Sequence, residues 1–476
     1  MSELTYRLRG VRAELVEVDA TPARNGGPLA LELSCNFGNG TVERAAEERA
    51  RVEHALDQQE AHLLINVDRS RLVRLPLDAL PQGDLAVVAA ICDWSDAKKR
   101  ARLDWEGVRW AFAGELRYDG GVGVCRGILP FALAAKQAGV TDIVVPSRQA
   151  QEAAACDGVR VHPVATLTDL LRTLIGAEDD IELPRSWEPS SSNDLCYSDV
   201  LGQRAAMRAM EIAAAGRHNL LLVGPPGTAK TMMARRAAAL LPPISREEAL
   251  ETTAVYSARG LVQEGSGLLM ARPFRAPHHT VSTGALVGSR NNGVRSGEVS
   301  LAHNGVLFLD ELPEFRLDTI EALAAVTKDG RARCGSETMP AEFWLLASAN
   351  PCGCGYYGDD RKLCACSRAS VDGYRSRLFK YVEMLGMIVT ETRSQKYASL
   401  LEGGKGEPTR YIRERVVAAE RVSTKLTLAA ADRLSDVGES RHHLARMVAS
   451  SVASLAGEFE VTPEHAADAV RLVKLV

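Results

Sequence analysis

Residues 219–231 read NLLLVGPPGTAKT, and they are the most informative part of the sequence about its fold. An uninterrupted apolar run up to Val223 is followed at once by a loop rich in glycine and proline, and then by Lys230 and Thr231. A continuous apolar run of this kind is typical of a strand that is buried on both faces of a parallel sheet. The stretch therefore predicts an α/β fold built on such a sheet.

The loop has the composition and spacing of a loop that binds a nucleoside triphosphate. Its glycines let the backbone N–H groups face phosphate oxygens at the start of a helix, which we expect from Met232 to Leu241. Lys230 would reach the β- and γ-phosphates of ATP, and the Thr231 hydroxyl would bind Mg²⁺. Ala229 replaces the usual glycine before the lysine, which narrows the allowed backbone angles. The candidate cofactor-binding residues are Gly224, Pro225, Pro226, Gly227, Thr228, Ala229, Lys230 and Thr231.

Two further apolar runs end in polar side chains that such a site needs. The run that starts at Val306 ends at Asp310 and Glu311. Asp310 could hold the Mg²⁺ through water, and Glu311 could polarise the attacking water. The run from 343 to 349 is followed by Asn350, whose amide could orient that water. Each feature is common by itself, but behind a phosphate-binding loop they predict a site for ATP hydrolysis.

Patterning divides the chain into three regions and a linker. The first region alternates strand-like runs such as 63–67 and 142–145 with Ala-rich helical stretches such as 129–139, which predicts a mixed α/β domain. The stretch 184–193 combines two prolines with three consecutive serines, as linkers do. The last region shows only amphipathic helical spacing. The expected boundaries are 1–175 for the first domain, 176–197 for the linker, 198–395 for the core with the phosphate-binding loop, and 406–476 for the helical region.

The composition excludes several classes of protein. Hydrophobic residues make up 46% of the chain and charged residues 25%, which excludes a disordered or collagen-like chain. The formal net charge is −4, so any nucleic acid would have to bind to local basic patches. The first ten residues lack the apolar segment of a signal peptide, and no stretch is apolar over the length that a membrane span needs. We therefore expect a cytoplasmic protein without membrane contact.

Four of the ten cysteines are close together in the sequence. Cys352 and Cys354 form one Cys-x-Cys pair, and Cys364 and Cys366 form a second. Four thiolates brought together by the intervening turn could bind Zn²⁺, while free thiols or a redox pair are the alternatives. Cations and tyrosines around the cluster could contact and stack on nucleic acid. They are Arg361, Lys362, Arg368, Arg375, Arg377 and Lys380, with Tyr356, Tyr357 and Tyr374.

Four stretches carry a resemblance to a known family. They are the loop 224–231, RPFRAPHHT at 272–280, GEVSLAHNGVLFLDELPEF at 297–315 and NPCGCGYYGD at 350–359. Together they resemble the magnesium-chelatase-like AAA+ ATPases of the competence protein M family, over nearly the whole chain. The resemblance implies a AAA+ core with a parallel sheet, an N-terminal α+β domain with the ribosomal-S5/Lon-protease-like fold, and a C-terminal helical lid.

Members of this family are thought to form hexameric rings that use ATP for branch migration or similar helicase-like remodelling of DNA, in recombination and natural transformation. By this resemblance, Asn350 is the sensor-1 residue. Arg441, placed before a helix from His442 to Ala456, is the sensor-2 residue that touches the γ-phosphate from the lid. The implied catalytic residues are thus Glu311, Asn350 and Arg441. The implied partners are ATP with Mg²⁺, single-stranded or branched DNA, and further copies of the chain.

The stretch 272–290 occupies the place where this group carries an insertion that faces the ring pore. Its cations and histidines could contact a DNA backbone there without reading the sequence. The alternative is an ordinary loop with two core or surface histidines. The residues concerned are Arg275, His278, His279 and Arg290.

Two stretches depart from the family pattern. In relatives, the segment after 374–378 contains an arginine that is thought to reach the nucleotide of the neighbouring subunit, but here Phe379 to Gly386 follows instead. Binding of ATP should be intact, whereas its turnover should suffer. In the first domain, Leu129 stands where a Lon-type protease needs a lysine, and 80–86 offers no serine nucleophile. We therefore expect a scaffold or interaction module there.

Three functions compete on these observations. The first is a AAA+ motor that remodels DNA. The second is a chelatase-like ATPase with a client other than DNA, or a weakly active paralogue that binds ATP but lacks the arginine finger. The third is an ATP-dependent protease, which the missing serine and lysine disfavour.

Overall fold

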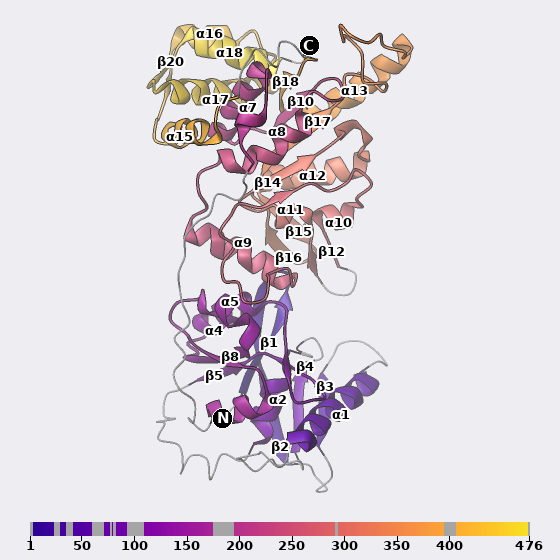
Figure 1. Cartoon of the computed structure of the whole chain (residues 1–476), viewed down its shortest axis with the longest axis vertical. Coiled ribbons are helices and arrows are strands. Elements are labelled where there is room, and N and C mark those ends of the chain that lie inside the picture. Colours follow the sequence, from indigo (N-terminus) through magenta and orange to yellow (C-terminus); the bar gives the residue numbers. More distant parts are fainter. Residues whose placement is uncertain are drawn as a thin grey trace. The chain divides into compact units, whose positions relative to one another are not determined.

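The computed structural model describes residues 3–22, 29–34, 41–59, 71–76, 79, 82–92, 109–174, 195–290, 294–394 and 406–474. They group into two compact units (Figure 1). Unit 1 comprises Met1–Trp187 and Ala249–Leu269, and unit 2 comprises Glu188–Glu248 and Met270–Val476. Residues 176–194 of the expected linker and the strand expected over 63–67 lie outside the described residues.

Unit 1 is built on a mixed seven-stranded sheet with the strand order β3-β4-β2-β1-β5-β8-β9. β1 and β2 are antiparallel, whereas β5, β8 and β9 run parallel to one another. The strand expected over 142–145 is confirmed as β8. The strands are β1 (Glu3–Arg9), β2 (Arg12–Pro22), β3 (Ala30–Ser34), β4 (Arg71–Pro76), β5 (Trp110–Phe112), β8 (Asp142–Pro146) and β9 (Arg160–Val164), with a small hairpin of β6 (Glu115–Leu116) and β7 (Val122–Gly123).

The helices of unit 1 cover this sheet with apolar side chains. Every residue of α2 is buried, including Asp84 at its first position. This carboxylate lies 2.7 Å from the Arg51 guanidinium and accepts a hydrogen bond from the Leu116 N–H at 2.8 Å, but burial outweighs these contacts and raises its pKa to about 7. The helices are α1 (Thr41–Gln59), α2 (Asp84–Ile91), α4 (Ile128–Gln137), α5 (Ala150–Ala154) and α6 (Leu167–Leu174).

Residues 249–269 group with unit 1, although the sequence analysis placed them in the core with the phosphate-binding loop. They include most of α9 (Arg246–Ala258). The Ser257 hydroxyl donates to the buried Glu152 carboxylate at 2.5 Å, and its carbonyl accepts from the Gly127 N–H at 2.9 Å. Glu152 also accepts a hydrogen bond from the backbone N–H of Leu129. The side chain of Leu129, which stands where a Lon-type protease needs a lysine, is fully buried. Because these hydrogen bonds join segments that are remote along the chain, the sequence pattern did not predict this grouping.

Unit 2 contains a five-stranded sheet in the order β11-β14-β17-β10-β18, and every neighbouring pair is parallel. The three apolar runs of the sequence analysis form its three central strands, so the predicted α/β fold with a parallel sheet is confirmed. The two edge strands were not predicted. The strands are β10 (Leu220–Val223), β11 (Phe274–Arg275), β14 (Val306–Leu309), β17 (Trp344–Ala349) and β18 (Ile388–Glu391).

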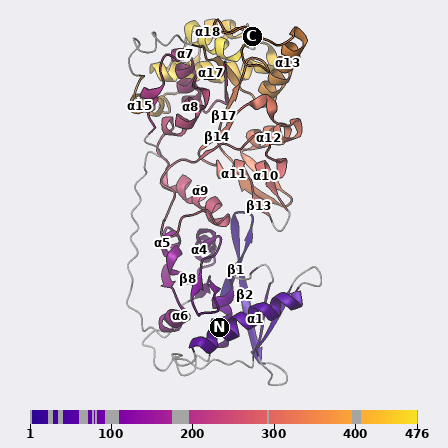
Figure 2. The same ribbon diagram turned by 45° about the vertical axis from the view of Figure 1, so that its right-hand side comes forward.

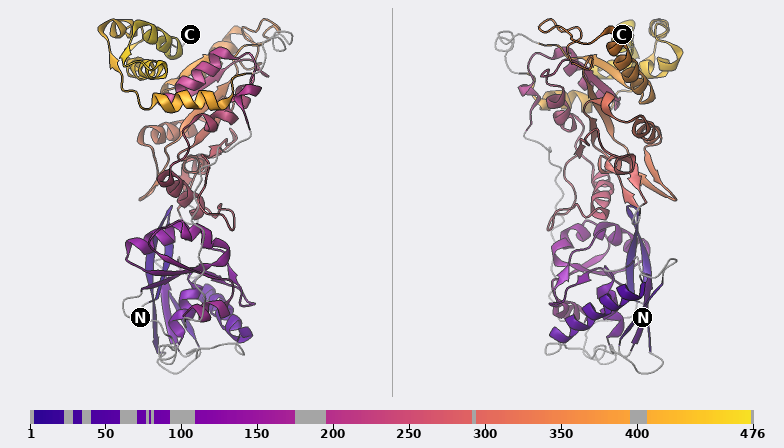
Figure 3. Two further views of the ribbon diagram at one scale, coloured as in Figure 1. Left: turned by 60° about the vertical axis from the view of Figure 1, so that its left-hand side comes forward. Right: turned by 90° about the vertical axis from the view of Figure 1, so that its right-hand side faces the viewer.

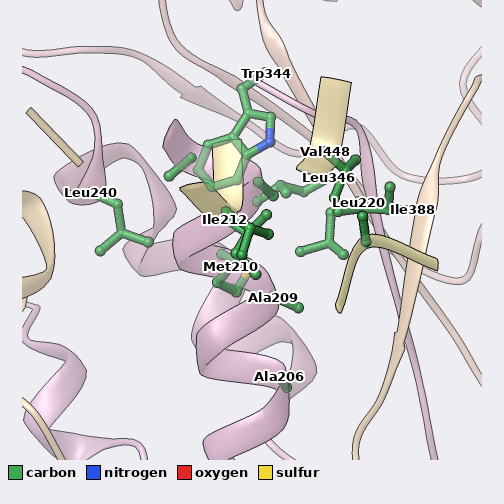
Figure 4. Packing of buried hydrophobic residues seen from close by; sticks show 14 of the residues in the cluster. Ala206, Ala209, Met210, Ile212, Leu220, Leu240, Trp344, Leu346, Ile388 and Val448 are labelled. Atoms are coloured by element: carbon green, nitrogen blue, oxygen red, sulfur yellow. The ribbon is translucent and has the colours of Figure 1, made fainter. Parts of the chain in front are cut away.

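The three central strands of unit 2 are apolar apart from Ser348 because both faces of the sheet are covered. Leu220 and Leu222 belong to one apolar cluster, together with Trp344, whereas Leu221 belongs to the cluster on the opposite face. Figure 4 shows Trp344, Leu220 and their neighbours packed between the sheet and a helix. In Figure 2, α7 and α8 lie on one side of β14 and β17, and α10 and α12 lie on the other. Burial of this kind contributes about 25 cal/mol per Å² of apolar surface.

The connections of unit 2 are mostly helical. The expected helix after the phosphate-binding loop is shorter than predicted, because its last turn is a 3₁₀-helix, Ala237–Leu240. The helices are α7 (Arg204–Gly216), α8 (Lys230–Arg236), α10 (Thr283–Val287), α11 (Glu298–Leu301), α12 (Leu317–Asp329) and α13 (Arg368–Met384), and two hairpins are formed by β12 (Gly288–Ser289) with β13 (Arg295–Ser296) and by β15 (Arg331–Cys334) with β16 (Glu337–Pro340).

The C-terminal helices, orange to yellow in Figure 3, gather at one end of unit 2. Their apolar faces join the same cluster as α7 and β10. No strand was expected here, yet a parallel pair of two-residue strands connects the helices, and strands this short produce no alternating pattern in the sequence. The elements are α15 (Thr409–Ala419), β19 (Lys425–Leu426), α16 (Leu428–Leu434), α17 (Glu439–Ala456), β20 (Glu460–Val461) and α18 (Pro463–Val473). Among the described helices, none combines the length and hydropathy needed to cross a membrane.

His218 joins the C-terminal helices to the sheet. Its ring lies 2.8 Å from the Ser451 hydroxyl of α17, and its carbonyl accepts a hydrogen bond from the Trp344 indole at 2.8 Å. Burial lowers the pKa of His218 from its ordinary value of 6.5 to about 4. The unfolded chain takes up this proton below pH 6.5 and the folded chain does not, so stability is complete above pH 6.5 and declines as the pH falls toward 4.

We therefore expect the free energy of unfolding to fall by up to about 3 kcal/mol between pH 6.5 and pH 4 on account of this one group. In His218→Gln the melting temperature should depend less on pH over this range than in the wild type. The exposed His443, also on α17, provides the control His443→Gln, which should keep the wild-type slope. Equal slopes for His218→Gln and the wild type would contradict the assignment.

Candidate functional site

The phosphate-binding loop follows the carboxyl end of β10, and α8 begins at Lys230. Gly227 and Ala229 both have left-handed backbone conformations, with φ of 79° and 64°. Glycine adopts this conformation freely, whereas an alanine pays roughly 1–2 kcal/mol for it. Ala229 therefore holds, under strain, the backbone shape that a glycine usually supplies in this motif.

Lys230 is held inside the loop. Its ammonium donates to the carbonyls of Gly224 and Pro225 at 2.6 and 2.9 Å, and to the Asn350 amide oxygen at 3.3 Å. Burial lowers the pKa of Lys230 from 10.5 to about 8, although Asp310 and Glu311 act in the opposite direction. A bound phosphate would supply charged acceptors in place of these neutral ones, which favours the ammonium form.

Thr231 and Asp310 meet at the same edge of the sheet. The Thr231 hydroxyl donates to one oxygen of the Asp310 carboxylate at 3.0 Å. The Ser348 hydroxyl donates to the other oxygen. Because the strands are parallel and Leu309 lies beside Ala347, the next residues, Asp310 and Ser348, are neighbours. A hydroxyl and a carboxylate at this spacing are the oxygen ligands that Mg²⁺ prefers.

Ser348 and Thr392 are site residues that the sequence analysis missed. The Thr392 hydroxyl lies 2.6 Å from that of Thr228, and its N–H donates to the carbonyl of Val223 at 2.7 Å. A side chain on Gly224 would collide with Thr392, because a Cβ there would lie 2.1 Å from its hydroxyl. Gly224, at the start of the loop, is the feature of the sequence that indicates a close approach by another segment.

Glu311 follows Asp310 in a left-handed conformation with φ of 57°. Its side chain is about half exposed, and one carboxylate oxygen lies 3.7 Å from Nδ1 of His279. This exposure leaves room for a water beside the carboxylate, as a general base requires. The structure thus brings together Lys230, Thr231, Asp310 and Asn350. Glu311, which directly follows Asp310, lies next to this group.

Arg441 is not brought to this site. Helix α17 begins at Glu439, three residues before the expected start at His442, so Arg441 lies in its first turn. Its guanidinium donates to the carbonyl of Met387, just before β18. Since β18 and β10 are parallel and in register, Met387 lies at the amino end of the strands, roughly 13 Å from the loop at about 3.3 Å per residue. In this arrangement Arg441 cannot touch a γ-phosphate, and the implied sensor-2 role stays a prediction for another position of the lid.

The four residues expected to contact DNA lie in different surroundings. Arg275 forms a two-pronged ion pair with Glu298, with distances of 2.7 and 2.9 Å. The rings of His278 and His279 are in contact in a tilted arrangement, with their centroids 4.0 Å apart. Arg290 packs against the turn at Gly335 between β15 and β16. The charge of Arg275 is therefore already paired, which leaves it less available to a phosphate than the sequence suggested.

The four clustered cysteines are brought together as expected. The sulfur atoms of Cys352, Cys354, Cys364 and Cys366 all lie within 4.8 Å of one another, and the three pairs among the first three are 3.4–3.7 Å apart. Tetrahedral zinc–thiolate bonds of 2.3 Å would place the sulfurs about 3.8 Å apart. Hydrogen bonds from backbone N–H groups, chiefly that of Tyr356, lower the pKa of the Cys354 thiol to about 6, whereas the pKa of Cys364 is raised to about 12 and that of Cys366 is also raised, so the spacing of the sulfurs carries the assignment. The four residues therefore fit a Zn²⁺ ion.

The basic residues around the cluster are partly engaged. The Lys362 ammonium lies 4.1 Å from the centre of the Tyr356 ring, and Arg375 lies between Tyr357 and Phe379 at 5.7 and 5.5 Å. Arg377 donates to the carbonyl of Pro313, and Arg368 lies 4.0 Å from Asp372. Tyr374 is half-buried, and burial raises its pKa to about 12. Tyr357 is the most exposed of the three tyrosines and offers the most accessible ring.

Comparisons with known proteins agree with this geometry. Residues 196–395 match the family model described as magnesium chelatase, subunit ChlI. The chain is 39% identical over 350 residues to an uncharacterized protein of Mycobacterium tuberculosis, covering 72% of this chain and 67% of that protein. It is 32% identical over 431 residues to competence protein ComM of Haemophilus influenzae, covering 87% and 80%. It is 33% identical over 367 residues to YifB of Escherichia coli, covering 74% and 70%.

The chelatase model spans the whole segment from the phosphate-binding loop to Asn350. The relatives match over most of their own length, so the likeness is not confined to a shared nucleotide-binding motif. The α/β unit with its parallel sheet and its Lys230–Asp310 site is what such an ATPase needs. For these reasons the chain belongs to the ComM/YifB family of magnesium-chelatase-like AAA+ ATPases.

Proposed function

We propose that this protein is an ATP-driven motor that remodels DNA, by branch migration or a helicase-like step in recombination or natural transformation. The observation that carries the ATPase part is the convergence of Lys230, Thr231, Asp310 and Asn350 at one edge of the sheet. The family resemblance and the relative named a competence protein support DNA as the client. In the same proposal the active form is a homohexamer.

Each residue of the site has its own task in this proposal. Lys230 exchanges the loop carbonyls for the β- and γ-phosphate oxygens. Thr231 and Asp310 hold the Mg²⁺, which supplies electrostatic stabilisation of the charge that develops on the transferred phosphoryl group. Glu311 accepts a proton from the attacking water, and Asn350 orients that water and the γ-phosphate.

The zinc site belongs to the same proposal. The Zn²⁺ would be held by the thiolates of Cys352, Cys354, Cys364 and Cys366, whose spacing fits a tetrahedral site. With all four positions taken by the protein, the ion would have no open coordination position for a substrate. Its role is therefore structural.

DNA-stimulated ATP hydrolysis tests the proposal directly. The rate of phosphate release should rise when branched DNA is added to the purified chain, and the oligomer should grow to a hexamer when ATP is added. If the rate of phosphate release is the same with and without single-stranded or branched DNA, the alternative of a chelatase-like ATPase with another client is favoured. Cleavage of casein would favour the protease, which the buried Leu129 disfavours.

Lys230→Ala should weaken the binding of a fluorescent ATP analogue about 100-fold, because the phosphates lose their charge-assisted hydrogen bonds to the loop's side-chain cation. Lys328→Ala, on an exposed lysine in the last turn of α12, should bind like the wild type. Glu311→Gln should bind the analogue normally and lower the turnover of ATP about 100-fold or more. Wild-type affinity in Lys230→Ala would show that the loop assignment is wrong.

The purified protein should contain about one Zn²⁺ per chain, because four thiolates satisfy one tetrahedral ion. Metal analysis after purification without chelators measures this number, and Cys354→Ser with Cys364→Ser should remove the ion. Cys334→Ser, at a buried cysteine of β15 outside the cluster, should retain it. If the protein contains no zinc and all four thiols react freely with a thiol reagent, the zinc site is wrong and the segment is a basic loop with free cysteines.

Turnover of ATP should be weak even in the assembled ring. The residues that bind ATP lie within one chain, whereas the arginine that would stabilise the transition state from the next subunit is absent at its expected place, and such an arginine is worth about 10³-fold or more in rate. Arg377 and Lys380, the nearest cations, are the candidates to replace it. A DNA-stimulated turnover of several per second, unchanged in the double variant Arg377→Ala, Lys380→Ala, would mean that another arginine serves as the finger.

A further inference from the structure

The turn between the two cysteine pairs rests against the phosphate-binding loop. Gly355 has a left-handed conformation with φ of 87°, and a Cβ built on it would lie 2.8 Å from Cδ and 3.0 Å from Cγ of Pro226. Real Cβ atoms do not approach other carbons this closely, so a residue with a side chain would displace one of the two segments. The backbone of the cysteine segment, residues 352–366, is therefore in direct contact with the loop that takes the phosphates.

The start of the cysteine segment is tied to the nucleotide site as well. Cys352 is fully buried, and its carbonyl accepts a hydrogen bond from the Gly355 N–H at 2.9 Å. Two residues before Cys352 stands Asn350, whose amide oxygen accepts from the Lys230 ammonium. A movement of the first cysteine would thus be passed to Asn350 through a single intervening residue.

The middle of the segment is tied to the other side of the loop. Asp359 accepts a hydrogen bond from the Ser394 hydroxyl at 2.9 Å. Ser394 lies two residues after Thr392, whose hydroxyl contacts that of Thr228 at 2.6 Å. The phosphate-binding loop is therefore flanked by two segments that are joined to each other through the Asp359–Ser394 hydrogen bond.

Apolar packing does little to hold the cysteine segment in place. Leu363 is 91% exposed and Tyr357 is 46% exposed, and Cys352 and Gly355 are the buried residues of the segment. A turn of this length without a core cannot offset the conformational entropy of its residues by burial. Sulfur–metal bonds from its two ends would supply the missing constraint.

We propose that the metal held by the four thiolates is a brace for the nucleotide site, so that the affinity for ATP depends on metal occupancy. With the metal bound, Gly355 supports Pro226, and Asn350 stays beside Lys230. Without it, the turn loses its fixed shape, and the phosphate-binding loop loses the wall on which Pro226 rests. The inference depends on the ATP binding and the zinc site proposed above, and it adds that the two are coupled.

A matched pair of glycines tests the contact. Gly355 and Gly358 both have left-handed conformations, with φ of 87° and 76°, but a Cβ on Gly358 would meet no atom within 4 Å. Gly355→Ala and Gly358→Ala therefore introduce similar backbone strain, and only the first disturbs Pro226. We expect Gly355→Ala to weaken binding of a fluorescent ATP analogue at least tenfold, and Gly358→Ala to change it less than twofold. Equal affinities in the two variants would overturn the proposal.

Removal of the metal tests the coupling itself. The full chain is treated with a zinc chelator, passed over a gel-filtration column, and titrated with the ATP analogue in buffer that contains Mg²⁺. The affinity should fall at least tenfold and should recover when one equivalent of Zn²⁺ is added back. Cys354→Ser with Cys364→Ser should bind the analogue as weakly as the stripped protein and should not respond to Zn²⁺, while Cys334→Ser should behave like the wild type.

The outcomes separate this inference from the proposed function. A wild-type chain that binds no nucleotide with zinc present would overturn both. Nucleotide binding that is the same before and after removal of zinc, and the same in Gly355→Ala and the wild type, would overturn the coupling alone and leave the ATPase assignment standing.

Discussion

The parallel register of β14, β17 and β10 is the constraint on which the rest of unit 2 depends. Strands that run in one direction place their carboxyl ends at one edge of the sheet, and the residues that follow them become neighbours. In this way Asp310, Asn350 and the phosphate-binding loop meet, although they are far apart along the chain. The apolar clusters on the two faces hold this register, because a slip by one residue would move each side chain to the opposite face, where its size no longer fits the packing.

Much of the nucleotide site could be predicted from the sequence because its signals are local. The loop 224–231 follows a strand directly, and the acids of 310–311 follow another, so each motif carries its own structural context. The four cysteines are also close in sequence, and their convergence needed only one turn. Motifs with fixed spacing can be predicted from the sequence because their residues are close along the chain, which limits how far apart they can lie in space.

Contacts between remote segments could not be predicted in this way. Thr392 reaches Thr228 only because β18 pairs with β10. The strand β11 has only two residues, and β18 ends in Thr390 and Glu391, so neither forms an apolar run that stands out in the sequence. Ser348 looked like an ordinary strand residue until the register placed it beside Asp310. Arg441 differs again, since its place before a helix matched a motif while its guanidinium here donates to the carbonyl of Met387, at the amino end of the strands, so its implied role stays a prediction.

The grouping of residues 249–269 with unit 1 has a consequence for how the chain acquires its structure during synthesis. Leu220 pairs with Leu346 and Ile388, so β10 has neither neighbour until most of unit 2 has been made. Unit 1 is completed only when Leu269 has emerged, after β10 and the phosphate-binding loop. Pairing over such distances in sequence is slow, and unpaired apolar strands are prone to aggregate meanwhile. The two units therefore mature in an interleaved order, and a fragment that ends at the linker lacks part of the structure to which it belongs.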